Sequence, residues 1–98
     1  MAIVDVTIAP RTEGAGGLSK YVAECHKVLK ESGLKHMLTP MSTIIEGDLD
    51  EILKVVRQMQ EKQFEMGALR VNTTIRIDDR RDIQASMEQK LNSVKSKL

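Results

Sequence analysis

The 98-residue sequence predicts an α+β fold in the order strand, helix, strand, strand, helix, strand, with an extra helix at the C-terminal end. Two observations carry this prediction. The first and last predicted strands alternate apolar and polar residues with a period of two, which is typical of half-buried strands. Two longer segments between them, and a third at the end, place apolar residues at helical spacing. The length fits one domain spanning residues 1–98.

The first strand and the first helix come from residues 2–32. The stretch "AIVDVTIAP" (2–10) places Val4, Val6 and Ile8 on one face and Ile3, Asp5 and Thr7 on the other. After the polar, glycine-rich stretch "RTEGAGG" (11–17), the period changes to that of a helix, with Gly33 in the position of a left-handed C-cap. Its apolar stripe consists of Leu18, Tyr21, Val22, Cys25, Val28 and Leu29.

Two short strands and a second helix follow. "HMLTP" (36–40) and "STIIEG" (42–47) read as strands, and Pro40 places their junction at an edge, a bulge or the turn itself, because proline donates no ladder hydrogen bond. Asp48 followed by Glu51 matches a capping box and predicts the start of the helix, and Gly67 predicts its end. Its buried stripe is predicted to contain Leu49, Ile52, Leu53, Val56 and Met59.

The last strand is predicted over residues 68–78 ("ALRVNTTIRID"), and a final helix follows "DDRRD" (78–82). Leu69, Val71, Thr73, Ile75 and Ile77 alternate along the strand with Arg70, Asn72, Thr74 and Arg76. The stripe of the final helix is predicted to be Ile83, Met87, Leu91, Val94 and Leu98. Two right-handed crossovers would place both central helices on one face of a single antiparallel sheet, which is the ferredoxin-like βαββαβ arrangement.

Composition excludes several classes of function. Fifteen basic and fourteen acidic residues give a net charge of +1. This balance produces no strong electrostatic field that would favour binding to nucleic acid or to an anionic membrane. No apolar run approaches the roughly 20 residues that span a bilayer. The two aromatic residues, Tyr21 and Phe64, cannot give the open sheet face the stacking platform of an RNA-binding sheet. The lone Cys25 and the absence of a basic region before the first apolar stretch favour a cytoplasmic protein.

Nucleophilic and metal chemistry receive little support. Cys25 and His26 are neighbours on a helix and diverge by about 100°, so they do not face each other. Cys25 lies on the buried stripe and is interpreted as a core residue. His26 and His36 have no metal-ligand spacing around them, and both are interpreted as surface histidines.

Two further segments admit more than one interpretation. The glycines of residues 11–17 could cradle a phosphate ahead of the first helix, but without a phosphate-binding signature a plain loop is favoured. In residues 78–82, Arg80 and Arg81 could bind an anion. Equally, this segment could be a self-paired helix start capped by Asp79 or Asp82.

The open face of the predicted sheet is the favoured place for a binding site. It would carry Ile3, Asp5 and Thr7 from the first strand and Arg70, Asn72, Thr74 and Arg76 from the last. Glu46, with Thr39, Ser42 and Thr43, would lie beside this face. A carboxylate among hydroxyl and amide groups suits a small polar heterocycle or a cation. A plain solvated sheet is the alternative.

The chain resembles the MTH1187-like thiamine-binding family, also called UPF0045 or DUF77. The resemblance is carried by "VTIAP", by "LSKYVAECHKVLKESGLKHMLTPMSTIIEG" and by "GALRVNTTIRIDDRRD", and it covers nearly the whole chain. It implies a ferredoxin-like subunit that forms dimers and dimers of dimers (a homotetramer) by packing sheets. It also implies binding of thiamine or its hydroxymethylpyrimidine part without catalysis. The matching positions are Ser19, Tyr21, Thr39, Pro40, Met41, Thr43, Glu46, Gly47, Arg70, Arg80 and Arg81.

The resulting hypothesis is a cytoplasmic, non-catalytic homo-oligomer without a resident cofactor or metal, whose ligand is thiamine or hydroxymethylpyrimidine. Glu46 would accept a hydrogen bond from the pyrimidine or balance the thiazolium charge, and Arg70 would meet an anion. The hydroxyls of Thr39, Ser42 and Thr43 would orient the amino group of the pyrimidine. Met41 or Tyr21 would pack against a ring of the ligand. The complete predicted ligand-binding set is Ser19, Tyr21, Thr39, Met41, Ser42, Thr43, Glu46, Arg70 and Asn72.

Two other classes stay open. One is a structural or regulatory oligomeric module without a vitamin ligand. The other is a small enzyme that acts on a phosphoester or acyl phosphate through Arg70 and Asn72, for which the sequence offers no activated nucleophile or paired base.

Overall fold

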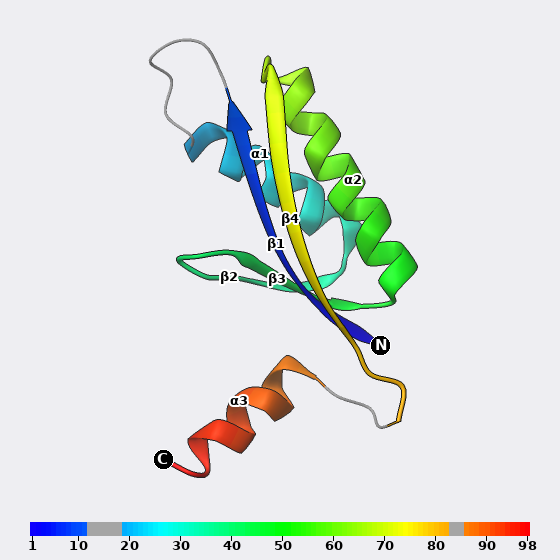
Figure 1. The fold of residues 1–98 in the computed structure, drawn as a ribbon, viewed down its shortest axis with the longest axis vertical. Coiled ribbons are helices and arrows are strands. Elements are labelled where there is room, and N and C mark those ends of the chain that lie inside the picture. The colour runs from blue at the N-terminus through cyan, green and yellow to red at the C-terminus, as the bar shows by residue number, and fades with distance from the viewer. Residues whose placement is uncertain (12–18, 83–85) are drawn as a thin grey trace.

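A computed structural model describes residues 1–11, 19–82 and 86–98 (Figure 1). The elements in chain order are β1 (Ala2–Arg11), α1 (Ser19–Ser32), β2 (Lys35–Leu38), β3 (Thr43–Gly47), α2 (Leu49–Glu65), β4 (Arg70–Asp79) and α3 (Met87–Lys95). This is the predicted order. Most of the glycine-rich stretch, with Leu18 and Ile83 of the predicted stripes, lies outside the described residues.

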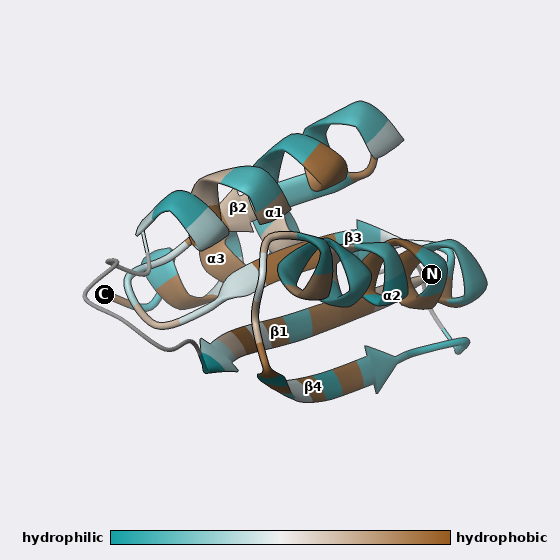
Figure 2. Ribbon diagram, turned by 90° about the horizontal axis from the view of Figure 1, so that it is seen from above, coloured by the Kyte–Doolittle hydropathy of each residue, from teal (hydrophilic) through white to brown (hydrophobic). Residues whose placement is uncertain are grey.

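The four strands form one antiparallel sheet in the order β2-β3-β1-β4. The helices α1 and α2 lie on the same face of this sheet, and α3 stands apart near the N-terminal end of β1 (Figure 1). Figure 2 shows the alternation of hydrophilic and hydrophobic positions along β1 and β4. The α+β, ferredoxin-like arrangement with an extra C-terminal helix is therefore confirmed.

The core lies between the sheet and the two central helices. Its buried members are Ala2, Val4 and Val6 of β1, Cys25 and Leu29 of α1, Ile45 of β3, and Ile52, Val55, Val56 and Met59 of α2. The predicted α2 stripe was wrong in one position, because Leu53 is 36% exposed whereas Val55 is 5% exposed. Ile52, Val55, Val56 and Met59 follow the i, i+3, i+4, i+7 spacing of one helix face, and Leu53 falls outside it.

Helix boundaries follow local capping chemistry. Asp48 accepts a hydrogen bond from the Glu51 backbone N–H at 3.2 Å, as predicted. Gly33 has a φ of 76°, the left-handed conformation expected after α1. The predicted caps of the last helix were wrong: Asp79 ends β4, and Ser86 caps α3 in a reciprocal capping box with Gln89.

Strand register decides which side chains share a face. Residues that pair directly point to the same side, so one row across the open face consists of Lys35, Glu46, Ile3 and Asp78. The next residue along each strand points toward the helices. Glu46 and Thr43, three positions apart on β3, consequently point to opposite faces of the sheet.

Candidate functional site

A cavity of about 200 Å³ opens between α1, the sheet and the β2–β3 turn. Its walls are mostly apolar, with a few hydroxyl, amide and imidazole groups among them. They are Val6, Thr7, Ile8, Tyr21, Val22, Cys25, His26, Leu38, Thr39, Pro40, Met41, Ser42, Thr43, Met59 and Gln63.

This cavity lies on the helix-covered side of the sheet. Val6 and Thr43 pair directly on adjacent strands and share the face that α1 and α2 cover. Tyr21 and Cys25 supply the α1 wall, and Gln63 supplies part of the α2 wall. The location differs from the sequence-based expectation of a site on the open face. The cavity forms because α1 does not fill the space beside the β2–β3 turn. The alternation of residues along a strand does not predict such a space.

The β2–β3 turn, which lines the cavity, is held together by the Thr39 side chain. Its hydroxyl donates to the Ser42 carbonyl at 2.8 Å and accepts the backbone N–H groups of Met41 (3.3 Å) and Ser42 (3.0 Å). The Thr39 backbone N–H also donates to the Ser42 carbonyl, at 2.8 Å. The Thr39 hydroxyl is thus engaged in the turn, and the loop that carries Met41, 85% exposed, is held in place by it.

Gln63 places a buried amide at the cavity wall. The residue is 1% exposed, and its Nε2 donates to the Tyr21 carbonyl at 3.2 Å and to Cys25 Sγ at 2.6 Å. The Cys25 thiol in turn donates to the Met59 carbonyl at 3.7 Å. Within the part of the chain that the structure describes, Gln63 Oε1 is buried and has no hydrogen-bond partner.

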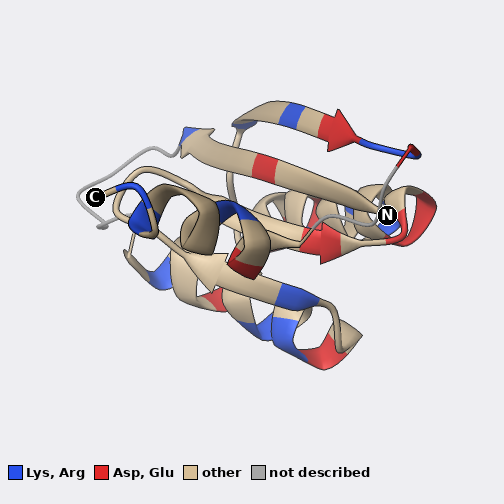
Figure 3. Ribbon diagram, turned by 90° about the horizontal axis from the view of Figure 1, so that it is seen from below, with Lys and Arg blue, Asp and Glu red and all other residues tan. Residues whose placement is uncertain are grey.

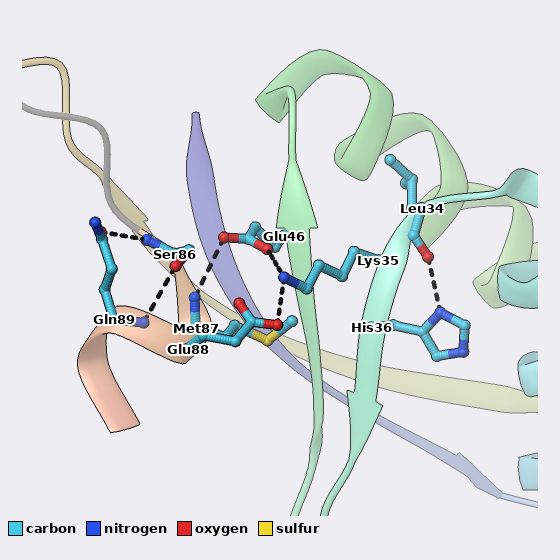
Figure 4. Close-up of polar contacts among 8 residues, drawn as sticks. All are labelled: Leu34, Lys35, His36, Glu46, Ser86, Met87, Glu88 and Gln89. Carbon is cyan, nitrogen blue, oxygen red and sulfur yellow. Dashed lines mark hydrogen bonds and ion pairs between the residues drawn. The ribbon is translucent and has the colours of Figure 1, made fainter. Parts of the chain in front are cut away.

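His26 supplies a second buried polar atom. Its Nε2 is buried and has no partner among the described residues, although the residue as a whole is half-buried. Burial, and secondarily the nearby His36, lower the pKa of His26, so the ring is neutral at pH 7. The two ring centroids are 5.9 Å apart, and His36 Nδ1 donates to the Leu34 carbonyl at 2.8 Å (Figure 4). The interpretation of His26 as a surface residue was therefore wrong.

Cys25 is a core residue, as predicted. Burial raises the pKa of its thiol to about 11, with the Gln63 hydrogen bond acting in the opposite direction. The thiol is therefore protonated at neutral pH, and a protonated thiol is a poor nucleophile. Its place in the site is structural, since it holds the Gln63 amide.

The structure brings five of the nine predicted ligand-binding residues to this cavity and leaves four elsewhere. The five are Tyr21, Thr39, Met41, Ser42 and Thr43. Ser19 is the exposed first residue of α1. Arg70 and Asn72 are exposed on the open face, where they pair with Arg11 and Ala9 of β1.

Glu46 also lies away from the cavity and has a local structural environment of its own (Figure 4). It is 5% exposed on the open side of the sheet, under the start of α3. Its Oε1 accepts the Met87 backbone N–H at 3.2 Å, and its Oε2 pairs with Lys35 Nζ at 3.2 Å. Lys35 also pairs with Glu88. Glu46 therefore anchors the N-terminus of α3 to the sheet, where a negative charge is stabilised by the helix dipole.

The charged segment at the end of β4 is self-paired. Arg80 bonds Asp82 through two nitrogens at 2.7 and 3.0 Å, and Arg81 Nη2 pairs with Asp79 at 2.9 Å. On the open face Arg76 pairs with Asp5, and this pair, followed by Ser42, lowers the pKa of Asp5. Figure 3 shows basic and acidic positions interspersed along β4 and the helices. The self-paired interpretation of residues 78–82 fits this geometry.

Sequence reasoning missed Gln63 and His26. Gln63 follows Met59 by four positions on the buried stripe of α2, so a polar residue on an apolar stripe was a signal available in the sequence. His26 gave no such signal, because it adjoins the stripe of α1, and its ring contact with His36 of β2 does not follow from spacing within the helix.

No helix within the described residues is long and apolar enough to cross a membrane. No cluster of three or more metal-ligating side chains occurs among residues 1–11, 19–82 and 86–98.

Known proteins resemble this chain in sequence, and two solved structures share its fold. A UPF0045 protein of Bacillus subtilis is 44% identical over 102 residues, which cover 100% of this chain and 98% of that protein. The structure of a hypothetical protein from Methanocaldococcus jannaschii has a TM-score of 0.86 at 35% identity, covering 96% of this chain and 95% of that one. A Thermotoga maritima protein with a proposed role in thiamine biosynthesis or salvage has a TM-score of 0.82 at 22% identity, with coverage of 95% and 97%. The last likeness shows the fold alone.

The family model described as "Thiamine-binding protein" matches residues 4–95, which include every wall of the cavity. This match spans nearly the whole chain and agrees with the full-length similarity to the Bacillus protein. The chain therefore belongs to the thiamine-binding protein family.

Proposed function

We propose that this protein binds thiamine, or its hydroxymethylpyrimidine part, without catalysis, in the cavity between α1 and the β2–β3 turn. The observation that carries the proposal is a mostly apolar cavity whose wall includes a few hydroxyl, amide and imidazole side chains. Pockets with apolar walls and a few placed polar groups are the usual sites of small heterocyclic ligands. Membership of the thiamine-binding protein family supports the choice of ligand.

The size of the cavity favours the pyrimidine ring as the enclosed part. At about 200 Å³ it is smaller than the roughly 300–1,000 Å³ that encloses a drug-sized ligand. One substituted ring fits this volume better than the whole of thiamine. The exposed side chains of Val22, Leu38 and Met41 at the opening would then cover the part of the ligand that remains outside.

The charges of the site agree with this orientation. Among the described residues, the cavity wall carries no carboxylate, lysine or arginine, and His26 is neutral at pH 7. Burying an unpaired cation is costly, whereas a neutral aminopyrimidine loses little on entry. The positively charged thiazolium is expected to stay at the opening. Glu46 has no part in this proposal because it lies on the other face of the sheet.

Thr43 and Tyr21 are the predicted residues that the proposal keeps at the ligand. Thr43 faces the cavity from β3, and the buried Tyr21 ring forms part of the α1 wall, with its hydroxyl donating to the Met66 carbonyl at 3.5 Å. The assignment of a binding role instead of catalysis is supported by the protonated Cys25 thiol. It is also supported by the family description as a binding protein.

We further propose that the chain works in the cytoplasm as a homo-oligomer, a dimer or a dimer of dimers. Exposed apolar residues in and after α3 support self-association: Leu91 and Val94 of the helix, and Leu98, which follows it. Cys25, the single cysteine of the sequence, has no second cysteine for an internal disulfide, which suits a reducing compartment. Native mass spectrometry at micromolar concentration is expected to show an even-numbered assembly, and a monomer would overturn this part of the proposal.

Calorimetric titration with thiamine and with hydroxymethylpyrimidine tests the binding proposal. Both are expected to bind at one site per chain. Thr43→Val should leave folding intact and weaken binding by about 1–3 kcal/mol, the usual cost of an unpaired polar group. Asn72→Ala, on the exposed open face, is the matched control and should bind as the parent does.

The opposite result for these two variants would place the site on the open face and contradict the proposal. An intact assembly that takes up neither compound would favour the alternative, a structural or regulatory module without a vitamin ligand.

A further inference from the structure

We propose that the outer edge of β4 pairs with the same edge of a second copy of this chain. In this assembly the two β4 strands run antiparallel about a two-fold axis at Thr74, and the four strands of each chain join in one eight-stranded sheet. This pairing rests on the homo-oligomer part of the proposed function and deepens it, because it names the surface and the register through which two copies meet.

The outer edge of β4 is open along its whole length in the described part of the chain. β4 has β1 as its only neighbour in the sheet, and the ten pairs from Ala2 with Asp79 to Arg11 with Arg70 follow one another without a bulge. Figures 2 and 3 show β4 as the outermost described element on its side of the molecule. An antiparallel strand turns the N–H and C=O groups of alternate residues away from its neighbour. A long, unbroken edge of this kind is a template for a further strand.

The opposite edge of the sheet has protection that β4 lacks. β2 is only four residues long and begins with Lys35, and both a short strand and a lysine discourage edge pairing. β4 is ten residues long and contains neither lysine nor proline. Of the two edges, that of β4 is therefore the one suited to a second strand.

The helix-side flank of this edge is apolar and matches itself across the proposed axis. Ile75 and Ile77 pair with buried residues of β1, yet they are 37% and 47% exposed. With the axis at Thr74, Ile75 lies opposite Thr73 of the second copy, and Ile77 lies opposite Val71 of the second copy. Each such pair occurs twice, so pairing buries an apolar row that is exposed in the single chain.

The charges on the other side of β4 are also self-complementary in this register. Arg70 lies opposite Asp78 of the second copy, and Arg76 lies opposite Asn72. Arg70 is exposed and makes no ion pair within residues 1–11, 19–82 and 86–98. Asp78 pairs with Lys90 through Oδ2, so Oδ1 can accept from the arginine. The pairing therefore gives Arg70 a carboxylate partner at two symmetric positions.

Neighbouring registers fit less well than the axis at Thr74. An axis one residue earlier sets Arg70 against Arg76 of the second copy, and an axis two residues later sets Arg76 against itself. An axis one residue later sets the apolar Val71 against Asp79. Like charges directly opposite one another destabilise strand pairing, so the charges select one register as well as one edge.

Reversing the charges one at a time tests both the edge and the register. Arg70→Asp and Asp78→Arg each place like charges opposite one another at both symmetric positions. Each change is expected to weaken the contact roughly ten- to one-hundredfold, so that native mass spectrometry at low micromolar concentration shows half the parent mass. Arg57→Asp, at an exposed position of α2, is the matched control and should keep the parent mass.

Mixing the two reversed variants gives the sharper result. A chain with Arg70→Asp and a chain with Asp78→Arg face each other with opposite charges at both positions. The mixture is therefore expected to regain the parent assembly as a pairing of one variant with the other. Parent-sized assemblies of either variant alone, or a mixture of folded variants that does not recover, would overturn the pairing and leave the homo-oligomer proposal standing. A monomeric parent chain would overturn both.

A cysteine at the axis gives a test that does not depend on charge. Residues directly opposite on antiparallel strands have Cα atoms about 4.5–5.5 Å apart, which is within reach of a disulfide. Thr74→Cys is therefore expected to form a covalent dimer rapidly with copper phenanthroline as oxidant, because the native Cys25 is buried and does not compete. Ala9→Cys, exposed on β1, is the control: three strand spacings, about 14 Å, separate its two copies. Equal dimer yields from the two variants would overturn the pairing.

Discussion

The attachment of α3 to the sheet gives the sharpest test of the structural reasoning, through the substitution Glu46→Gln. The carboxylate accepts the first backbone N–H of α3 from Met87 and lies 3.2 Å from Lys35 Nζ. Glutamine keeps the shape and an acceptor oxygen but removes the charge. The substitution therefore isolates the electrostatic part of the anchor without opening a cavity.

The expected loss follows from two interactions. A hydrogen bond to a charged group is worth about 1.5–3 kcal/mol, against about 0.5–1.5 kcal/mol for a neutral one. The interaction of a negative charge with a helix N-terminus adds about 0.3–1 kcal/mol. Lys35 is half exposed and still pairs with Glu88, so its own loss is small. Because the neutral amide is also cheaper to bury, we expect Glu46→Gln to weaken α3 docking by about 1–2 kcal/mol.

Hydrogen exchange of the α3 backbone amides measures this docking directly. A loss of this size corresponds to roughly five- to thirtyfold faster exchange in α3, with exchange in β1 and α2 changed much less. Asp78→Asn is the matched control, because it removes the exposed ion pair between Asp78 and Lys90 of the same helix. An exposed pair contributes little, so exchange should change less than about threefold in that variant.

Two outcomes would refute the reasoning about Glu46. Unchanged exchange of α3 in Glu46→Gln would show that the carboxylate does not hold the helix. Loss of ligand binding with α3 exchange unchanged would return Glu46 to the ligand, in agreement with the original sequence-based hypothesis.

Two further predictions concern the cavity wall. The Cys25 thiol, whose pKa is raised to about 11, should react with iodoacetamide at pH 8 far more slowly than a free thiol. Unfolding in urea should restore rapid reaction. Rapid labelling of the native protein would contradict the burial of this thiol. The pKa of His26 is lowered in the folded chain, so the unfolded chain takes up the proton first as the pH falls through 6.5, and folding stability should decrease there. Urea midpoints at pH 7.5 and 5.5 should show a smaller difference in His26→Gln than in the parent, and an equal or larger difference would contradict the burial of the ring.

Local patterns predicted the elements of the fold well. Period-two alternation located β1 and β4, and the Asp48 cap and Gly33 set helix boundaries within one or two residues of those observed. These features depend on residues that are close in sequence, which is why they can be predicted from one sequence alone. The start of α3 was misjudged because its cap, Ser86, competes in the sequence with several aspartates that are equally good caps.

The candidate site was harder to predict because it depends on contacts between distant segments. Tyr21, Cys25 and Gln63 meet at the cavity from two different helices, and 42 positions separate Tyr21 from Gln63. Likewise, the bond from Met87 to Glu46 spans 41 positions. Neither contact follows from spacing within one element.

One part of the site was nevertheless decidable from the sequence. Side chains three positions apart on a strand point to opposite faces, so Thr43 and Glu46 could not serve one ligand on one face of β3. Applied strictly, this rule assigns Thr43 with Ile45 to the helix side and Glu46 with Ile44 to the open side. The closeness of polar residues in "STIIEG" then has two separate causes. Thr43 contributes to the cavity wall. Glu46 instead accepts a hydrogen bond from the N-terminus of α3, so the carboxylate that was predicted to bind a ligand holds this helix to the sheet.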